Sequence, residues 1–164
     1  MRQLFILLGL CVLAGPADAI APRSATYYCT PDAAGGVSYD KQLQRWNAAN
    51  FRPAKAFVLK LNHLSSAREK MFDGAELSAV NRFNVALTES GSSKDIPCRN
   101  MRDFPKPIEV WDEGWVRCDF NLTELRFNPE NNRFLTAYLV GYVSGDDDNS
   151  DTPVIGIGVC TKLN

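Results

Sequence analysis

The stretch with the clearest capacity for chemistry is the acidic segment Gly145 to Asp151, which reads GDDDNSD. Calcium binds several hard oxygen ligands, and the side chains of Asp146, Asp148 and Asp151 can supply them. The segment does not match an EF-hand loop, because Asp151 stands at position six, where glycine is required, and Ile157 at position twelve, where glutamate is. We favour the alternative, a solvated hairpin tip whose like charges oppose aggregation of strand edges, and we expect no metal or cofactor.

The sequence contains no catalytic motif. A Ser–His–Asp or Cys–His arrangement would have to use the single histidine, His63, and the GxSxG motif is absent. Glu109, Asp112, Glu113 and Asp119 can in principle supply the carboxylate pair of a glycoside hydrolase, but no spacing singles out two of them. We assign no catalytic residue and favour a protein that is not an enzyme, with an undetected carboxylate-dependent hydrolase as an alternative.

Aromatic residues offer a binding surface instead. Trp111 and Trp115 flank a turn at 112–114 and can stack across a hairpin, which is usually a packing contact. If the two indoles are exposed, they form a platform for a sugar or a partner protein. These tryptophans are therefore binding candidates.

Two tyrosines are binding candidates for a different reason. Tyr138 and Tyr142 share one face of a predicted strand, and Gly156 and Gly158 share one face of the strand that returns. Aromatic rings commonly cover glycines in a sheet, and this is the reading we favour. The alternative is a ligand cavity lined by the glycine face.

The cysteines indicate an oxidising compartment. Four of them, Cys29, Cys98, Cys118 and Cys160, follow the predicted leader, and an even number in an exported chain implies two disulfides. Three connectivities are possible. We favour Cys98–Cys118, which closes a short loop, and Cys29–Cys160, which ties the first strand to the last. Zinc is disfavoured, because there is no CxxC motif and only one histidine.

The first nineteen residues have the features of a signal peptide. Arg2 precedes the apolar run 4–14, and Ala17-Asp18-Ala19 fits a small-x-small cleavage site. We therefore expect a single domain at 20–164, located in the periplasm or secreted, with no transmembrane segment after cleavage. The net charge of −1 gives no argument for nucleic acid as a partner.

Alternating apolar residues predict strands through most of the remaining chain. The main predicted hairpin has strands at 134–143 and 154–160, and a second is expected across the turn at 112–114. Further strands are expected at 25–29, at 37–46 with a turn near Asp40-Lys41, and at 55–62, 82–89 and 122–127. We expect a loop at 30–36 and a short helix within 63–80, where Ser66 and Glu69 have the spacing of a capping box.

These elements predict a mainly β fold. About eight strands joined by turns, with no alternation of strands and helices, favour an antiparallel meander closed into a small β-barrel or a strongly curved sheet. A first strand disulfide-bonded to the last suits this arrangement. A two-sheet sandwich is the alternative.

The chain resembles a group of small exported bacterial proteins of unknown function, common in alphaproteobacteria. The matching residues are Cys29, Ala33-Ala34-Gly35, Trp46, Arg133-Phe134-Leu135, Gly141-Tyr142, Asp148-Asn149, Asp151-Thr152-Pro153, Ile157-Gly158 and Cys160. The resemblance implies export from a bacterial cell and paired cysteines, and it implies no activity. The favoured function is a non-catalytic binding module for an unknown small molecule or an envelope protein. A structural envelope protein that pairs with a partner is the alternative.

Overall fold

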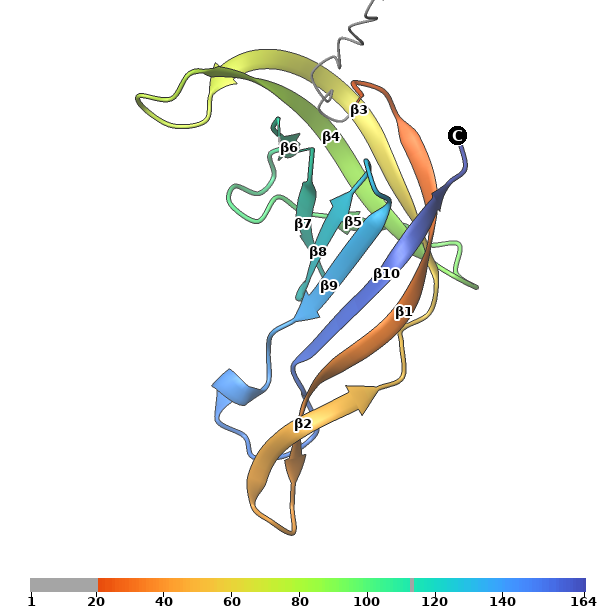
Figure 1. The fold of residues 1–164 in the computed structure, drawn as a ribbon, viewed down its shortest axis with the longest axis vertical. Coiled ribbons are helices and arrows are strands. Elements are labelled where there is room, and N and C mark those ends of the chain that lie inside the picture. The colour runs from red at the N-terminus through yellow and green to blue at the C-terminus, as the bar shows by residue number, and fades with distance from the viewer. Residues whose placement is uncertain (1–20, 113) are drawn as a thin grey trace, which may run out of the picture.

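The computed structural model describes residues 21–112 and 114–164, so the predicted leader (1–19) and Glu113 of the predicted turn lie outside the described residues. The elements are β1 (Ala25–Asp40), β2 (Arg45–Phe51), β3 (Phe57–Lys70), β4 (Leu77–Glu89), β5 (Ile96–Cys98), β6 (Ile108–Val110), β7 (Val116–Phe120), β8 (Thr123–Asn128), β9 (Arg133–Tyr138), the 3₁₀ helix η1 (Tyr142–Ser144) and β10 (Val154–Lys162) (Figure 1). This confirms the mainly β class. None of the helices in the described part of the chain has the length and apolar character needed to cross a membrane.

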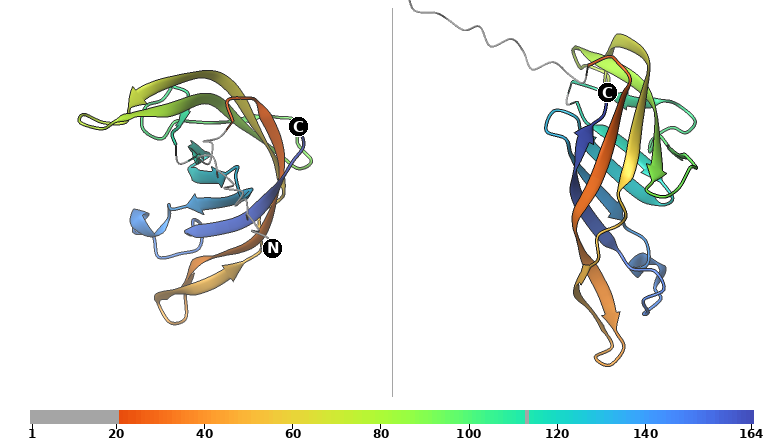
Figure 2. Two further views of the ribbon diagram at one scale, coloured as in Figure 1. Left: turned by 45° about the horizontal axis from the view of Figure 1, so that its top comes forward. Right: turned by 90° about the vertical axis from the view of Figure 1, so that its right-hand side faces the viewer.

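The ten described strands form one antiparallel sheet. Its order is β5-β4-β3-β1-β10-β9-β8-β7, while β2 pairs with β1 and β6 pairs with β4. The first strand therefore pairs with the last, as the sequence predicts. Figure 2 shows how strongly the sheet curls, so that β3 and β4 arch over the strands of the C-terminal half.

The long strand β1 is the template for this sheet. One of its edges pairs with β10, and the other pairs first with β3 and then with β2. The register shifts between Pro31 and Ala33, and a bulge of this kind accommodates a proline that has no amide hydrogen to donate. The loop predicted at 30–36 is therefore wrong, because strands on both sides override the low β-propensity of its small residues.

The helix predicted within 63–80 is also wrong. β3 and β4 continue as one long hairpin as far as the pair Lys70 and Leu77, and Gly74 takes a positive φ of 87° in the turn. Ser66 and Glu69, which suggested a capping box, instead lie opposite residues of β4. Pairing along the whole hairpin satisfies the backbone groups that a short helix would otherwise satisfy internally.

The chain turns at residues 112–114 as predicted, but the strands on either side of this turn do not pair with each other. The Gly114 amide donates to the Trp111 carbonyl oxygen at 2.8 Å. β6, however, pairs with β4, and β7 pairs with β8. The short strand before the turn thus belongs to the opposite side of the curved sheet.

The first strand of the main hairpin is shorter than predicted. β9 ends at Tyr138 and not at Val143, although it pairs with β10 as expected. Gly141 has a φ of +97°, and a Cβ placed there would lie 1.8 Å from the Asp151 carbonyl oxygen. The positive φ of Gly141 directs the chain away from the β9 strand path, and the loop 139–153 begins there.

The sheet is curved and is not closed by continuous strand pairing. Its path ends at β5 and β7, yet these two edges meet. Cys98 of β5 forms a disulfide with Cys118 of β7, and the next residues, Arg99 and Asp119, exchange two backbone hydrogen bonds of 2.7 and 2.9 Å. We call this junction the edge clasp. The second disulfide joins Cys29 to Cys160, so the favoured cysteine pairing is confirmed.

The space inside the curved sheet is filled by side chains. Every strand except β2 contributes to one core cluster, whose members include Tyr27, Leu59, Phe83, Leu125 and Phe127. Tyr27 meets the Phe127 ring edge-on at 4.8 Å between ring centroids. The alternation of inward and outward residues predicted for the strands produces this core.

The glycine face of β10 is covered, as we favoured, but by a different ring. A Cβ on Gly158 would lie 2.6 Å from the Phe134 ring, and one on Gly156 would lie 2.8 Å from the Thr136 hydroxyl. Phe134 therefore takes the place that the sequence assigned to Tyr138 or Tyr142. The interior face of these glycines is packed.

We predict that Gly158→Ala destabilises the protein by about 1–3 kcal/mol, the usual cost of overpacking a core. The new methyl group would also lie 2.3 Å from the Thr30 carbonyl oxygen, which cannot move without shifting β1. Gly35→Ala is the matched control, because its Cβ would meet its nearest neighbour, the Ala49 carbonyl oxygen, at 3.6 Å. Urea denaturation of both variants measures the difference, and equal stabilities would contradict this account of the core.

Candidate functional site

The acidic loop fastens the β1–β2 hairpin to the body of the sheet. The Tyr39 amide donates to Asn149 Oδ1 at 2.7 Å, and Asn149 Nδ2 donates to the Tyr39 carbonyl oxygen at 2.8 Å. Trp46 Nε1 donates to Asp147 at 2.9 Å, and the Trp46 ring meets Tyr142 edge-on at 5.5 Å between centroids. The loop is thus docked along the hairpin.

The three calcium candidates do not share a partner: Asp148 and Asp151 form separate hydrogen bonds. Asp148 accepts hydrogen bonds from the Ser150 hydroxyl and amide, which lower the pKa of its carboxyl group. Asp151 accepts a hydrogen bond from the Tyr138 hydroxyl, which raises the pKa of that phenol. Asp146 is exposed. The described residues contain no group of three or more His, Cys, Asp or Glu side chains able to hold a metal ion.

The four aromatic candidates do not gather at one place. Tyr138 contacts Asp151, and Tyr142 packs on Trp46 in the docked loop. Trp115 is 46% exposed and does not line the groove that contains Trp111. Trp111 lies in a groove near the edge clasp.

This groove has a volume of about 430 Å³. Its walls come from the β3–β4 turn, the loop 99–107, β6 with the residue that follows it, and β7. The lining residues are Met71, Asn100, Met101, Arg102, Asp103, Lys106, Glu109, Trp111 and Arg117. Smaller cavities of about 250 and 170 Å³ lie beside Phe104 and beside Arg23.

Asn100 shapes the wall formed by the loop 99–107. Its Nδ2 donates to the Pro107 carbonyl oxygen at 2.8 Å, and its Oδ1 accepts from the amides of Arg102 and Asp103 at 2.9 and 3.2 Å. The loop begins at the edge clasp, where the Arg99 guanidinium stacks over the Phe104 ring at 5.1 Å. These contacts fix residues 100–107, which precede β6 and belong to no strand.

The two carboxylates of the groove are paired with cations. Glu109 accepts from Arg82 Nη2 at 3.0 Å, and the same Arg82 atom contacts Glu69 at 2.6 Å. The hydrogen bond to Glu69, and to a smaller extent the one to Glu109, raises the pKa of the Arg82 guanidinium. Asp103 forms an ion pair with Lys106 and raises the pKa of that amine. Glu109 therefore has a structural partner, which weighs against the hydrolase alternative.

Two arginines that line the groove, Arg102 and Arg117, are not used in the ion pairs just described. Among the described residues, neither Arg102 nor Arg117 forms an ion pair. Both residues are exposed. They line the groove together with the indole of Trp111 and the thioethers of Met71 and Met101, so basic and apolar groups meet in one cavity.

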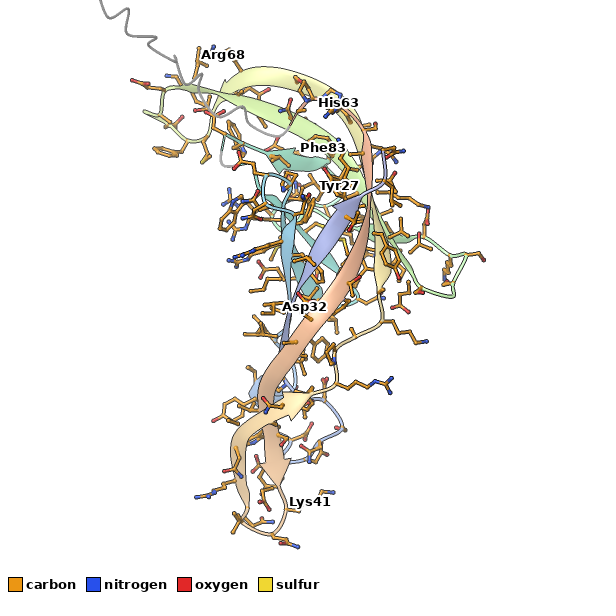
Figure 3. The ribbon with its side chains drawn as sticks, turned by 45° about the vertical axis from the view of Figure 1, so that its right-hand side comes forward. Tyr27, Asp32, Lys41, His63, Arg68 and Phe83 are labelled. Carbon is orange, nitrogen blue, oxygen red and sulfur yellow. A yellow bond between two sulfur atoms is a disulfide. The ribbon has the colours of Figure 1, made fainter. Side chains whose placement is uncertain are left out.

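His63 does not form a catalytic pair. Its Nε2 lies 3.0 Å from the Ser66 hydroxyl, but that hydroxyl donates to Asn81 Oδ1 at 2.6 Å. The serine proton is therefore directed away from the imidazole. The His63 ring also packs edge-on against Phe83, and Figure 3 shows the two residues on neighbouring strands near one end of the molecule. These contacts give His63, which lies in β3, a role in packing.

Sequence reasoning singled out Trp111 and Glu109 but missed the other groove residues. Met71, Arg102 and Arg117 belong to elements that are distant in the chain and meet only through the sheet curvature and the edge clasp. One local signal was present, because the stretch between Cys98 and Pro107 is both irregular and basic.

We predict that Asn149→Ala lowers the free energy of unfolding by about 1–2 kcal/mol, because two hydrogen bonds to the Tyr39 backbone are lost. Asn50→Ala, at an exposed position of β2, is the control and should have little effect. Chemical denaturation measures stability, and amide exchange at Tyr39 should accelerate only in the Asn149 variant. Unchanged exchange at Tyr39 would show that the docked loop does not hold the hairpin.

No protein-family model, curated protein or solved structure matches this chain. The resemblance to small exported bacterial proteins therefore stays a prediction.

Proposed function

We propose that this chain is an exported bacterial protein that acts as a non-catalytic binding module and holds a small molecule in the groove beside Trp111. The observation that carries the proposal is the groove itself. Small-molecule sites are typically concave, with volumes of roughly 300–1,000 Å³, and combine apolar or aromatic walls with a few polar groups. The groove has a volume of about 430 Å³ and both kinds of lining.

This ligand position differs from the cavity lined by Gly156 and Gly158, which is the alternative that the sequence offers. The interior of the curved sheet is occupied by the core cluster, and Phe134 covers Gly158. Space for a ligand lies at the outer end of the edge clasp, where the loop 99–107 and β7 form two walls. The module thus uses its packed sheet as a scaffold and its loops as the site.

Two disulfides support the proposed export. Both link cysteines that are mostly buried, and disulfides of this kind persist in oxidising compartments such as the bacterial periplasm. The predicted leader and the resemblance to exported bacterial proteins point the same way. We propose the periplasm or the extracellular space as the place where the module works.

The test is native mass spectrometry of the protein isolated gently from its own host. We expect a reproducible added mass that denaturation removes, because a bound small molecule leaves when the groove unfolds. Trp111→Ala should abolish the added mass by removing the aromatic wall. Trp115→Ala is the matched control, since this exposed tryptophan does not line the groove.

Two results would contradict the proposed function. One is a bare chain at the mass of the two-disulfide form under all gentle conditions. The other is an added mass that Trp111→Ala leaves intact, which would place the ligand elsewhere.

A second candidate function, a structural protein that associates with a copy of itself, is favoured by an exposed apolar area on the outer face of the sheet. Ile155, Ile157 and Val159 alternate along β10 and are 47%, 50% and 46% exposed. Contiguous apolar patches on the surface of a soluble protein often mark interaction sites. The structural alternative considered from the sequence therefore keeps a physical basis.

The charges beside this patch favour a second copy as its occupant. Arg117 of β7 lies opposite Arg126 of β8, and these two residues form an arginine row across the strands. Two residues further along β7, Asp119 lies opposite Glu124, and this pair forms an acidic row parallel to the first. A twofold axis that reverses the strand direction would bring the arginine row of one copy against the acidic row of the other. Like an isologous interface, this pattern is self-complementary.

Self-association predicts a dimer whose fraction rises with protein concentration in size-exclusion chromatography with light scattering. Ile157→Glu should abolish the dimer, because it places a charge in the apolar patch. Val143→Glu, at an 86% exposed residue of η1, should not. A protein that stays monomeric at every concentration would remove this second candidate.

A further inference from the structure

We infer that the ligand of the groove is a small organic anion, with its acidic group bound by Arg102 and Arg117 and a flat apolar body against Trp111. This inference rests on the proposed function, since it assumes that the groove holds a small molecule. It names the chemical class of that molecule from the charges and surfaces of the groove.

The charge balance of the groove favours an anion. Among the residues that the structure describes, three cationic residues and two carboxylates line it, which leaves one excess positive charge. Each carboxylate already has a partner, because Arg82 contacts Glu109 and Lys106 contacts Asp103. The guanidinium groups of Arg102 and Arg117 are the cationic groups that stay available to a ligand. Within residues 21–112 and 114–164 these two groups have no ion-pair partner, and an anion would supply one.

The position of Arg117 strengthens this argument. Its direct cross-strand partner is Arg126, and like charges placed opposite each other in a sheet are destabilising. Arg126 has its own partner, because its Nε contacts Glu124 at 2.5 Å. A bound anion would give Arg117 an equivalent partner and offset the repulsion. The planar guanidinium suits a carboxylate or a phosphate, which it can bind through two parallel hydrogen bonds.

The rest of the lining predicts an apolar body for the ligand. Trp111 offers an aromatic surface, and Met71 and Met101 are 40% and 50% exposed at the groove. Tryptophan favours flat rings, and methionine adapts to irregular apolar shapes. An inorganic ion would leave these three side chains in water. A flat acid of one or two rings would cover them while its charge reaches the arginines.

The experiment is isothermal titration calorimetry of the folded, two-disulfide protein with three naphthalene probes of equal ring size. These are 2-naphthoate, 2-naphthyl phosphate and the uncharged 2-naphthalenemethanol. We expect both anions to bind at least tenfold more tightly than the alcohol, and the advantage to shrink as salt rises. The tighter of the two anions tells a carboxylate ligand from a phosphate ligand.

Variants locate the acidic group. Arg102→Gln and Arg117→Gln should each weaken 2-naphthoate binding by roughly 10- to 100-fold, the range for losing charge-assisted hydrogen bonds. Binding of the alcohol should hardly change. Arg45→Gln is the matched control, because it removes a guanidinium at the start of β2, in the hairpin whose tip, marked by Lys41 in Figure 3, projects away from the body of the sheet.

The outcomes separate this inference from the proposed function. If all three probes bind equally and Trp111→Ala abolishes binding, the groove is a small-molecule site but the anion class is wrong. If none of the probes binds, the anion class is also wrong, and the proposed function is then decided by native mass spectrometry alone. Loss of 2-naphthoate binding in Arg45→Gln as well would show that overall charge, and not the groove, attracts the probe.

Discussion

The edge clasp is the constraint on which the rest of the structure depends. A curved sheet that is not closed has two free edges, and free edges expose unpaired backbone groups. Here the Cys98–Cys118 disulfide and the hydrogen bonds between Arg99 and Asp119 hold β5 against β7. A disulfide between cysteines 20 residues apart lowers the entropy of the unfolded chain, which adds about 3 kcal/mol to the free energy of unfolding. The same junction brings the loop 99–107 next to β7, so the groove exists only where the edges are held together.

Much of the fold could be predicted from local patterns. Alternating apolar residues located most strands, and Asn132 takes the left-handed conformation, with a φ of 58°, in the turn 129–132 before β9. The pairing of Cys29 with Cys160 followed from the idea that the first strand meets the last, and β1 does pair with β10. These successes share one cause, which is that burial on one face imposes a period of two on the sequence.

The failures arose where partners distant in the chain override local preference. Residues 30–36 look like a loop, yet β10 and β2 pair with most of them and hold them in a strand. Residues 63–70 have helical features, but the facing half of β4 makes them the end of a hairpin. The groove escaped prediction for the same reason, since the arginines and methionines that line it come from elements that touch only after the sheet has curved. Trp111 was identified because an aromatic residue beside a turn is a local signal.

The β1–β2 hairpin extends beyond the packed core, to which β2 contributes nothing (Figure 1). In mechanical terms it is an arm that leaves the sheet beyond Gly36, the last residue of β1 that pairs with β10. The loop 139–153 braces this arm through Asn149 and through the hydrogen bond from Trp46 to Asp147. The arm is therefore tied to the sheet twice, once through the backbone of β1 and once through side chains of the segment that connects β9 to β10.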